Sequence, residues 1–77
     1  MKLSRKENKA LSLLRFHGPM YGLDMVKESD GVLRRWSVYL VLAGLKQKGL
    51  VSWEEEPGPH GIPRRTYSAT ALNPDSE

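Results

Sequence analysis

The chain has 77 residues, and its 12 Lys and Arg against 9 Asp and Glu give a net charge of +3. This length fits one small domain, and the basic excess is compatible with binding a polyanion. The sequence has no cysteine and only two widely separated histidines, which excludes disulfides and thiolate metal sites, so we expect no cofactor.

No membrane-spanning or exported segment is expected. No apolar run approaches the roughly 18 residues that a transmembrane helix needs. The opening residues, MKLSRKENKA, are too polar for a secretory signal peptide, whose basic start is followed by an apolar stretch. We therefore expect a cytoplasmic protein without a membrane partner.

Two helices are expected first. Residues 4–17 carry apolar side chains at three- and four-residue spacings, and Gly18 and Pro19 follow as a stop signal. A short second helix is predicted over about residues 20–29, where Asp24 suits the positive end of the helix dipole.

A third helix is predicted from Ser37, a good N-cap residue, to Gly49, a typical C-capping residue. Val38, Leu42 and Leu45 fall on one side of it and should face the core. On this assignment the outer side carries Trp36, Leu40, Ala43, Gly44 and Gln47.

The sequence period then changes from helical to alternating. Residues 50–54 and 64–70 read as two strands, and residues 56–63 between them are rich in proline and glycine. We expect Trp53 and Tyr67, together with Tyr21 of the second helix, to lie in the core.

The order of these elements predicts an α+β winged helix-turn-helix fold, with three helices followed by a two-stranded β-hairpin wing. We expect this domain to span residues 1–72 and to leave residues 73–77 as a frayed tail. In this fold the third helix is offered to a groove of the nucleic acid, and the hairpin tip is the wing.

Three separated segments also match family motifs: GPMYGLDMVKES from Gly18, SVYLVLAGLKQKGLV from Ser37 and WEEEPGPHGIPRRTYSAT from Trp53. They resemble, in the same order and at similar spacing, motifs of the PadR-like transcriptional regulators. The resemblance covers about residues 11–70. It implies a DNA-binding regulator, commonly a repressor, with the third helix in the major groove of double-stranded DNA.

The resemblance also implies site residues. The positions that match are Ser37 and Tyr39 at the start of the third helix, Lys46 and Lys48 near its end, and Arg64 and Arg65 on the returning strand. The chain departs from the family at Trp36, where glycine is usual, and at Leu40, where proline is usual. The helices that form the family's dimer after the wing have no match, so a short form is expected, and a homodimer or another protein partner would need a different interface.

The residues expected to contact DNA share basic, polar or aromatic side chains on the third helix, the segment before it and the wing. They are Arg34, Arg35, Ser37, Tyr39, Lys46, Gln47, His60, Arg64 and Arg65. Strand alternation should send Arg64 and Arg65 to opposite faces, and the acidic residues 54–56 should face away from DNA or pair with one of these arginines.

A second reading stays open, because the outer side of the third helix is unusually apolar for a surface that reads base edges. Exposed Trp36 and Leu40 would also suit a protein-protein interaction module built on the winged helix scaffold. An enzyme is not expected, since the sequence has no glycine-rich phosphate loop, no nucleophile-elbow pattern and no paired carboxylates beside a histidine.

Overall fold

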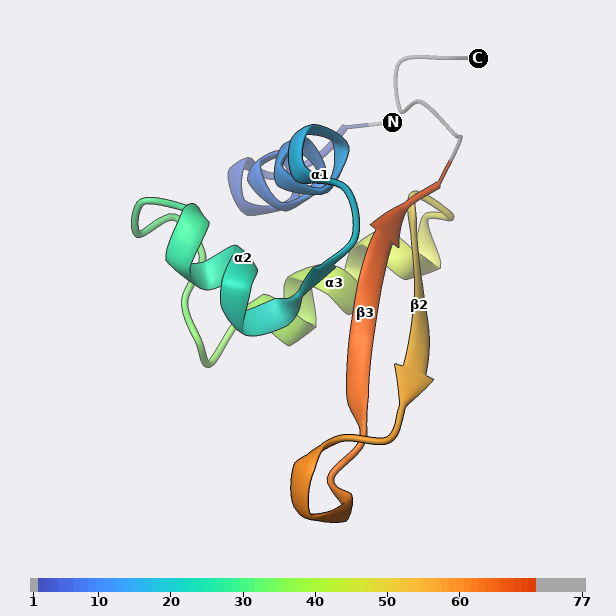
Figure 1. The fold of residues 1–77 in the computed structure, drawn as a ribbon. Coiled ribbons are helices and arrows are strands. Elements are labelled where there is room, and N and C mark those ends of the chain that lie inside the picture. The colour runs from blue at the N-terminus through green and yellow to red at the C-terminus, as the bar shows by residue number, and fades with distance from the viewer. Residues whose placement is uncertain (1, 71–77) are drawn as a thin grey trace.

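The computed structural model describes residues 2–70, so the tail expected at residues 73–77 lies outside the described residues. The helices come first, interrupted by one short strand, and a β-hairpin follows them in an α+β arrangement (Figure 1). In chain order they are α1 (Arg5–His17), β1 (Met20–Tyr21), α2 (Gly22–Glu28), α3 (Val38–Gln47), β2 (Val51–Glu56), a short 3-10 turn (Pro59–Gly61) and β3 (Arg64–Ala69).

The first helix agrees with its sequence signals. Ser4 is the N-cap: its hydroxyl accepts from the backbone N–H of Glu7 at 3.1 Å, while its own N–H donates to the Glu7 carboxylate at 3.0 Å. This reciprocal pair is a capping box, which satisfies two amide groups that a helix start otherwise leaves without partners. Gly18 ends the helix at φ 85°, where its N–H donates to the Leu14 carbonyl.

The second helix begins later than the sequence predicts. Met20 and Tyr21 form a short strand that pairs with Tyr67 and Thr66 of β3. Spacing favoured a helix from residue 20, but the backbone groups of these two residues find partners in a strand more than 40 positions later in the chain, as the register shows. The sheet therefore has three antiparallel strands in the order β1-β3-β2, not two, while the predicted fold class is confirmed.

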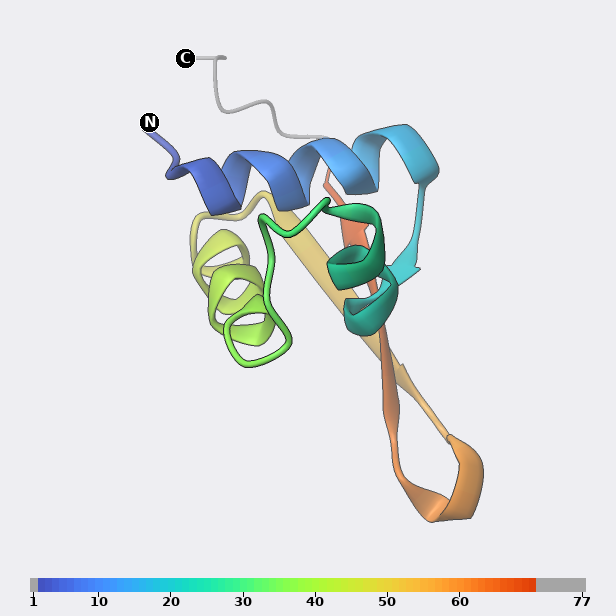
Figure 2. The same ribbon diagram turned by 90° about the vertical axis from the view of Figure 1, so that its left-hand side faces the viewer.

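The hairpin is longer than predicted on its first strand. β2 and β3 are paired from Val51 opposite Ala69 to Glu56 opposite Arg64. Its far end projects from the body of the molecule as the wing (Figures 1 and 2). Near the tip His60 adopts a left-handed conformation at φ 58°.

The core lies where α1 crosses over α2 and α3 and where the sheet closes the remaining side (Figure 2). Its largest fully buried side chains include Leu14, Met25, Leu42, Leu45 and Tyr67. Leu42, Leu45 and Tyr67 were expected in the core, so the helical period of the third helix and the alternation of the last strand predicted their buried faces correctly. Within residues 2–70, none of the helices has both the length and the apolar character required to cross a lipid bilayer.

Candidate nucleic-acid interface

One side of α3 is open to solvent. We call Trp36, Tyr39, Leu40, Ala43 and Gln47 the α3 outer face, because all five are exposed. Leu40 is 72% exposed and Trp36, just before the helix, is 76% exposed. Exposed large apolar side chains can mark an interaction surface, which makes this face a candidate site.

Gly44 does not belong to this face, contrary to the sequence-based assignment. A Cβ atom at this position would lie 3.1 Å from a carboxylate oxygen of Glu7, so Gly44 faces α1. The spacing of apolar residues along α3 could not show whether Gly44 faces solvent or a polar side chain of another helix. Gly44 allows α1 and α3 to approach closely.

The segment that carries α3 is strongly basic. Residues 31–53 contain no Asp or Glu, and their charged side chains are Arg34, Arg35, Lys46 and Lys48. The first three are exposed, whereas Lys48 Nζ lies 2.7 Å from Glu7 Oε2 in an ion pair. Lys48, which the resemblance implicated, therefore connects α3 to α1.

The wing arginines both lie against aromatic rings. Arg64 stacks near Tyr21, with its guanidinium carbon 4.9 Å from the ring centroid, and Arg65 lies 4.7 Å from the centroid of a Trp53 ring. The two arginines thus turn to different sides of β3, as strand alternation requires. Each guanidinium is oriented by the face of an aromatic ring.

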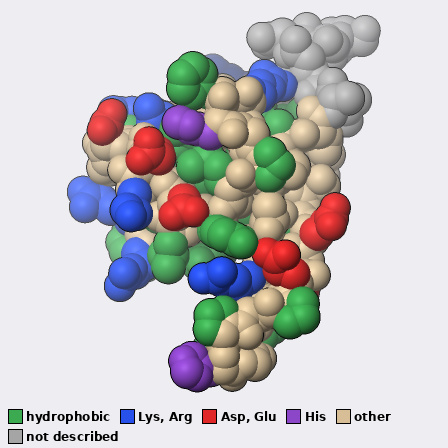
Figure 3. Space-filling view, in the orientation of Figure 1, with side chains coloured by type: hydrophobic (Ala, Val, Ile, Leu, Met, Phe, Trp, Pro, Cys, Tyr) green, Lys and Arg blue, Asp and Glu red, His purple; other side chains and the backbone are tan. Residues whose placement is uncertain are grey.

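The acidic run next to the wing is largely occupied by partners. Glu55 pairs with Arg65 across the hairpin at 3.7 Å, which confirms that part of the sequence-based expectation. Glu56 accepts a hydrogen bond from the Tyr21 hydroxyl at 2.9 Å. In Figure 3 blue Lys and Arg side chains and red carboxylates lie together where the wing leaves the body, and a histidine lies at its tip.

Trp53 joins α3 to the wing. Its ring has Lys46 Nζ at 4.8 Å and Arg65 at 4.7 Å from a ring centroid. The ring also packs edge-on against buried Tyr67. Trp53 is only partly buried and Tyr21 is exposed, so the expectation that both lie in the core was wrong for Tyr21 and incomplete for Trp53.

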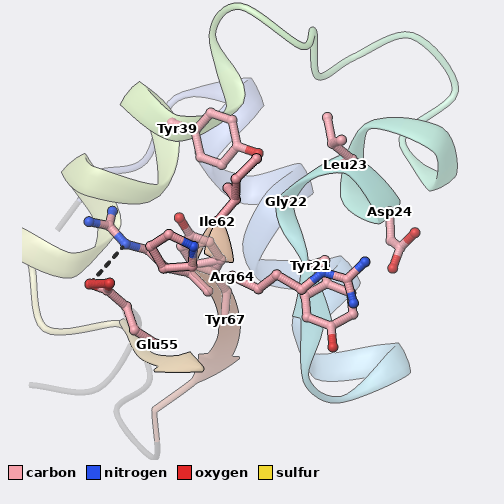
Figure 4. Close-up of a pocket in the computed structure, with 11 residues that line it drawn as sticks. Tyr21, Gly22, Leu23, Asp24, Tyr39, Glu55, Ile62, Arg64 and Tyr67 are labelled. Carbon is pink, nitrogen blue, oxygen red and sulfur yellow. Dashed lines mark ion pairs between the residues drawn. The ribbon is translucent and has the colours of Figure 1, made fainter. Parts of the chain in front are cut away.

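A hollow of about 630 Å³ separates the start of α2, α3 and the wing. Figure 4 shows Tyr21 and Gly22 on one side of it, Tyr39 of α3 above, and Ile62 of the wing across from them, while the Arg64 side chain reaches to Tyr21. Gly22 leaves room for the Tyr39 ring, because a Cβ there would lie 2.8 Å from it. Sequence reasoning missed the roles of Tyr21 and Gly22, because only the β1-β3 pairing brings them to the wing.

Ser37 is placed differently from the other predicted site residues. It precedes α3 as expected, but it is only 5% exposed, and its hydroxyl makes no capping bond and lies 3.5 Å from the Arg34 carbonyl oxygen. Its side chain therefore has little surface to offer a ligand. The other predicted residues on α3, before it and on the wing are exposed, and they are Arg34, Arg35, Tyr39, Lys46, Gln47, His60, Arg64 and Arg65.

Two solved structures are similar to this chain over most of its length. A proposed transcriptional regulator from Thermoplasma acidophilum has a TM-score of 0.68 and 26% identity, over 84% of this chain and 68% of that chain. A PadR-like transcription factor from Bacteroides fragilis has a TM-score of 0.67 and 26% identity, over 87% of this chain and 70% of that chain. The chain therefore has the winged helix fold of these regulators and is similar to a PadR-like transcription factor in structure.

No protein-family model and no curated protein sequence matches this PadR-like chain. Two of its departures from the family motifs are strongly exposed apolar side chains. Trp36 and Leu40 replace the usual glycine and proline, and both lie on the α3 outer face. At these two positions, the α3 outer face is therefore more apolar than the family motifs would make it.

Proposed function

We propose that this PadR-like chain is a DNA-binding transcriptional regulator that places α3 in the major groove and the wing against the adjacent backbone. The observation that carries the proposal is an exposed helix face beside a projecting hairpin, with exposed cations on both elements. Arg34 and Arg35 precede α3, and Arg64 and Arg65 lie on the returning strand of the wing. Phosphate contacts by such cations position a protein on DNA without reading its sequence.

The site residues we propose follow from exposure. The DNA phosphates would be contacted by exposed cations, which are Arg34, Arg35, Arg64, Arg65 and, near the end of α3, Lys46. The hollow beside Tyr39 opens between α3 and the wing, and these two elements would lie on either side of one sugar-phosphate strand. His60 at the wing tip is exposed and within reach of a groove that the wing follows. We propose repression as the mode of action, because the family whose motifs the chain resembles acts commonly by repression.

The test of this proposal is the salt dependence of binding to a labelled duplex, measured by fluorescence anisotropy. A domain that contacts about four phosphates should lose affinity with a slope near −3.6 of log affinity against log salt concentration. The double variant Arg64→Ala, Arg65→Ala should bind more weakly with a flatter slope. Arg15→Ala on α1, remote from the wing, is the matched control and should keep the slope. Unchanged affinity and slope in the double variant would mean that the wing arginines do not contact DNA.

A second candidate function rests on the exposure of Trp36 and Leu40. Two large apolar side chains close together at a surface are typical of protein interfaces. If the α3 outer face binds a second copy or another protein, Leu40→Glu should abolish concentration-dependent association in analytical ultracentrifugation while the thermal melting curve stays cooperative. Association that is absent, or indifferent to this change, would leave DNA binding as the better supported function.

A further inference from the structure

The α3 outer face offers very few groups that can hydrogen-bond to a base edge. Trp36 precedes the helix and is partly covered by Lys6, whose Nζ lies 5.4 Å from a centroid of its ring. Tyr39 turns toward α2, since a Cβ at Gly22 would lie 3.2 Å from the Tyr39 hydroxyl. The helix surface that remains for the floor of a groove therefore consists of Leu40, Ala43 and the amide of Gln47.

The chemistry of these side chains matches one kind of base pair. In the major groove thymine presents the only methyl group, and apolar side chains such as Ala contact it, while glutamine pairs with adenine N6 and N7. Guanine is read by arginine or lysine, and cytosine by a carboxylate. No acidic residue lies between residues 31 and 53, and Lys46 is held over Trp53 at 4.8 Å.

We propose that α3 selects A·T base pairs, with Leu40 and Ala43 contacting thymine methyl groups and Gln47 pairing with adenine. This inference rests on the proposed DNA-binding function and names the class of sequence that the site takes. The exposed charged side chains on α3 and in residues 31–37 before it are all cations, namely Arg34, Arg35 and Lys46, and they favour DNA over a protein as the occupant of this face. An apolar helix face next to such cations is complementary to a groove whose floor carries methyl groups and whose walls carry phosphates.

The experiment compares three labelled duplexes of equal length by fluorescence anisotropy at one salt concentration. The first is A·T-rich, the second has deoxyuridine in place of every thymine, and the third is G·C-rich. Deoxyuridine lacks only the methyl group, so the change isolates the apolar contact. We expect the thymine duplex to bind most tightly and each lost methyl contact to weaken binding about fourfold, which corresponds to roughly 0.8 kcal/mol per buried methylene-sized group.

Two variants separate base reading from backbone contact. Leu40→Ala should lose much of the difference between the thymine and deoxyuridine duplexes. Arg64→Ala should weaken binding to both duplexes by the same factor, because a phosphate contact does not depend on the base. Leu40 is exposed, so the fold should survive its truncation, and a circular dichroism melting curve checks this.

The outcomes distinguish this inference from the function on which it rests. Salt-sensitive binding with equal affinity for all three duplexes, or a preference for the G·C-rich one, would overturn A·T selection and leave the DNA-binding regulator in place. No binding to any duplex at low salt would overturn both. In that case self-association weakened by Leu40→Ala would assign the α3 outer face to a protein partner.

Discussion

Glu7 connects the beginning of α1 to the end of α3. Its carboxylate accepts from the Ser4 backbone N–H at 3.0 Å and from Lys48 Nζ at 2.7 and 2.8 Å. The hydrogen bond from Lys48, followed by that from the Ser4 backbone, holds the pKa of Glu7 below its usual value of 4.5. The charged form is therefore the one that the folded protein stabilises.

The pH dependence of stability should reveal this carboxylate. Since its pKa is lower in the folded state, Glu7 stabilises the fold above the unfolded value near 4.5, and this contribution disappears as pH falls through the folded value. Glu7→Gln should lower the free energy of unfolding at neutral pH by about 1–3 kcal/mol, as for hydrogen bonds to charged groups. Urea titrations at neutral and acidic pH should show the difference from wild type shrinking toward acid.

The control for this prediction is Glu54→Gln, which changes an exposed carboxylate on β2. Its effect on the free energy of unfolding should be within about 0.5 kcal/mol, as for most surface substitutions. If the difference in unfolding free energy between Glu7→Gln and wild type does not vary with pH, the charge of Glu7 does not stabilise the fold, and the substitution acts through altered hydrogen-bond geometry.

At the scale of single elements, the turn between α2 and α3 depends on one buried hydroxyl. Ser29 is fully buried; its Oγ donates to the Val26 carbonyl at 2.9 Å and accepts from the Leu33 N–H at 2.9 Å. This closes a turn in which Asp30 and Gly31 both have positive φ. Serine, aspartate and glycine are common turn residues, but the sequence did not show that the Ser29 side chain would fix the path of the chain into α3.

Trp53 performs a similar task between α3 and the wing. Because its ring faces Lys46 and Arg65 at 4.8 and 4.7 Å, it limits where the two cations can lie. Contacts of this kind are worth about 0.5–1 kcal/mol at exposed sites, enough to bias the position of a long side chain. The wing is thus connected to the proposed recognition helix by a side chain as well as by the backbone.

The ring contact predicts a magnetic signature. Protons near the face of an indole are shielded, so the terminal methylene protons of Lys46 and Arg65 should resonate upfield of their usual positions in NMR spectra. Trp53→Leu should return both sets to ordinary values and should lower affinity for DNA severalfold. Trp36→Leu is the matched control: it should move the corresponding Lys6 resonances and leave those of Lys46 and Arg65 unchanged. Shifts unaffected by Trp53→Leu would contradict the stacked arrangement.

At the scale of the whole molecule, the small size of the core makes each large side chain important. A domain of about this length buries only roughly 60% of the surface that its unfolded chain exposes. Leu42 on α3 is fully buried among side chains from α1, α2 and the sheet. The inner face of α3 therefore holds the fold together while its outer face is left for binding.

The two faces of α3 should respond differently to the same truncation. Leu42→Ala should cost about 2–5 kcal/mol of unfolding free energy, the range for deleting a buried leucine. Because small domains are stable by only about 5–15 kcal/mol, the melting temperature should fall steeply. Leu40→Ala on the outer face should change stability by no more than about 0.5 kcal/mol. Calorimetry that finds the two variants equally stable would mean that α3 is oriented differently.

Much of this protein is determined locally, and the sequence alone therefore predicts it. The end of α1 at Gly18, the stripe of Val38, Leu42 and Leu45, and the alternation around Trp53 each depend on neighbours a few positions away, and all were placed correctly. The winged helix class follows from the order of those elements, whereas the PadR-like resemblance rests on the residues of three separate segments. The exposed positions on α3 and the wing could be named for the same reason.

Contacts between residues far apart in the chain were decided only by the tertiary structure. The strand at Met20 and Tyr21 forms because β3 supplies its hydrogen-bond partners, and Gly44 faces Glu7 because α1 crosses α3 there. The same holds for Lys48, which is removed from the candidate surface by an ion pair with a residue 41 positions earlier. Local periodicity fixes which side of an element is apolar, whereas the partner of each polar side chain depends on how the elements pack.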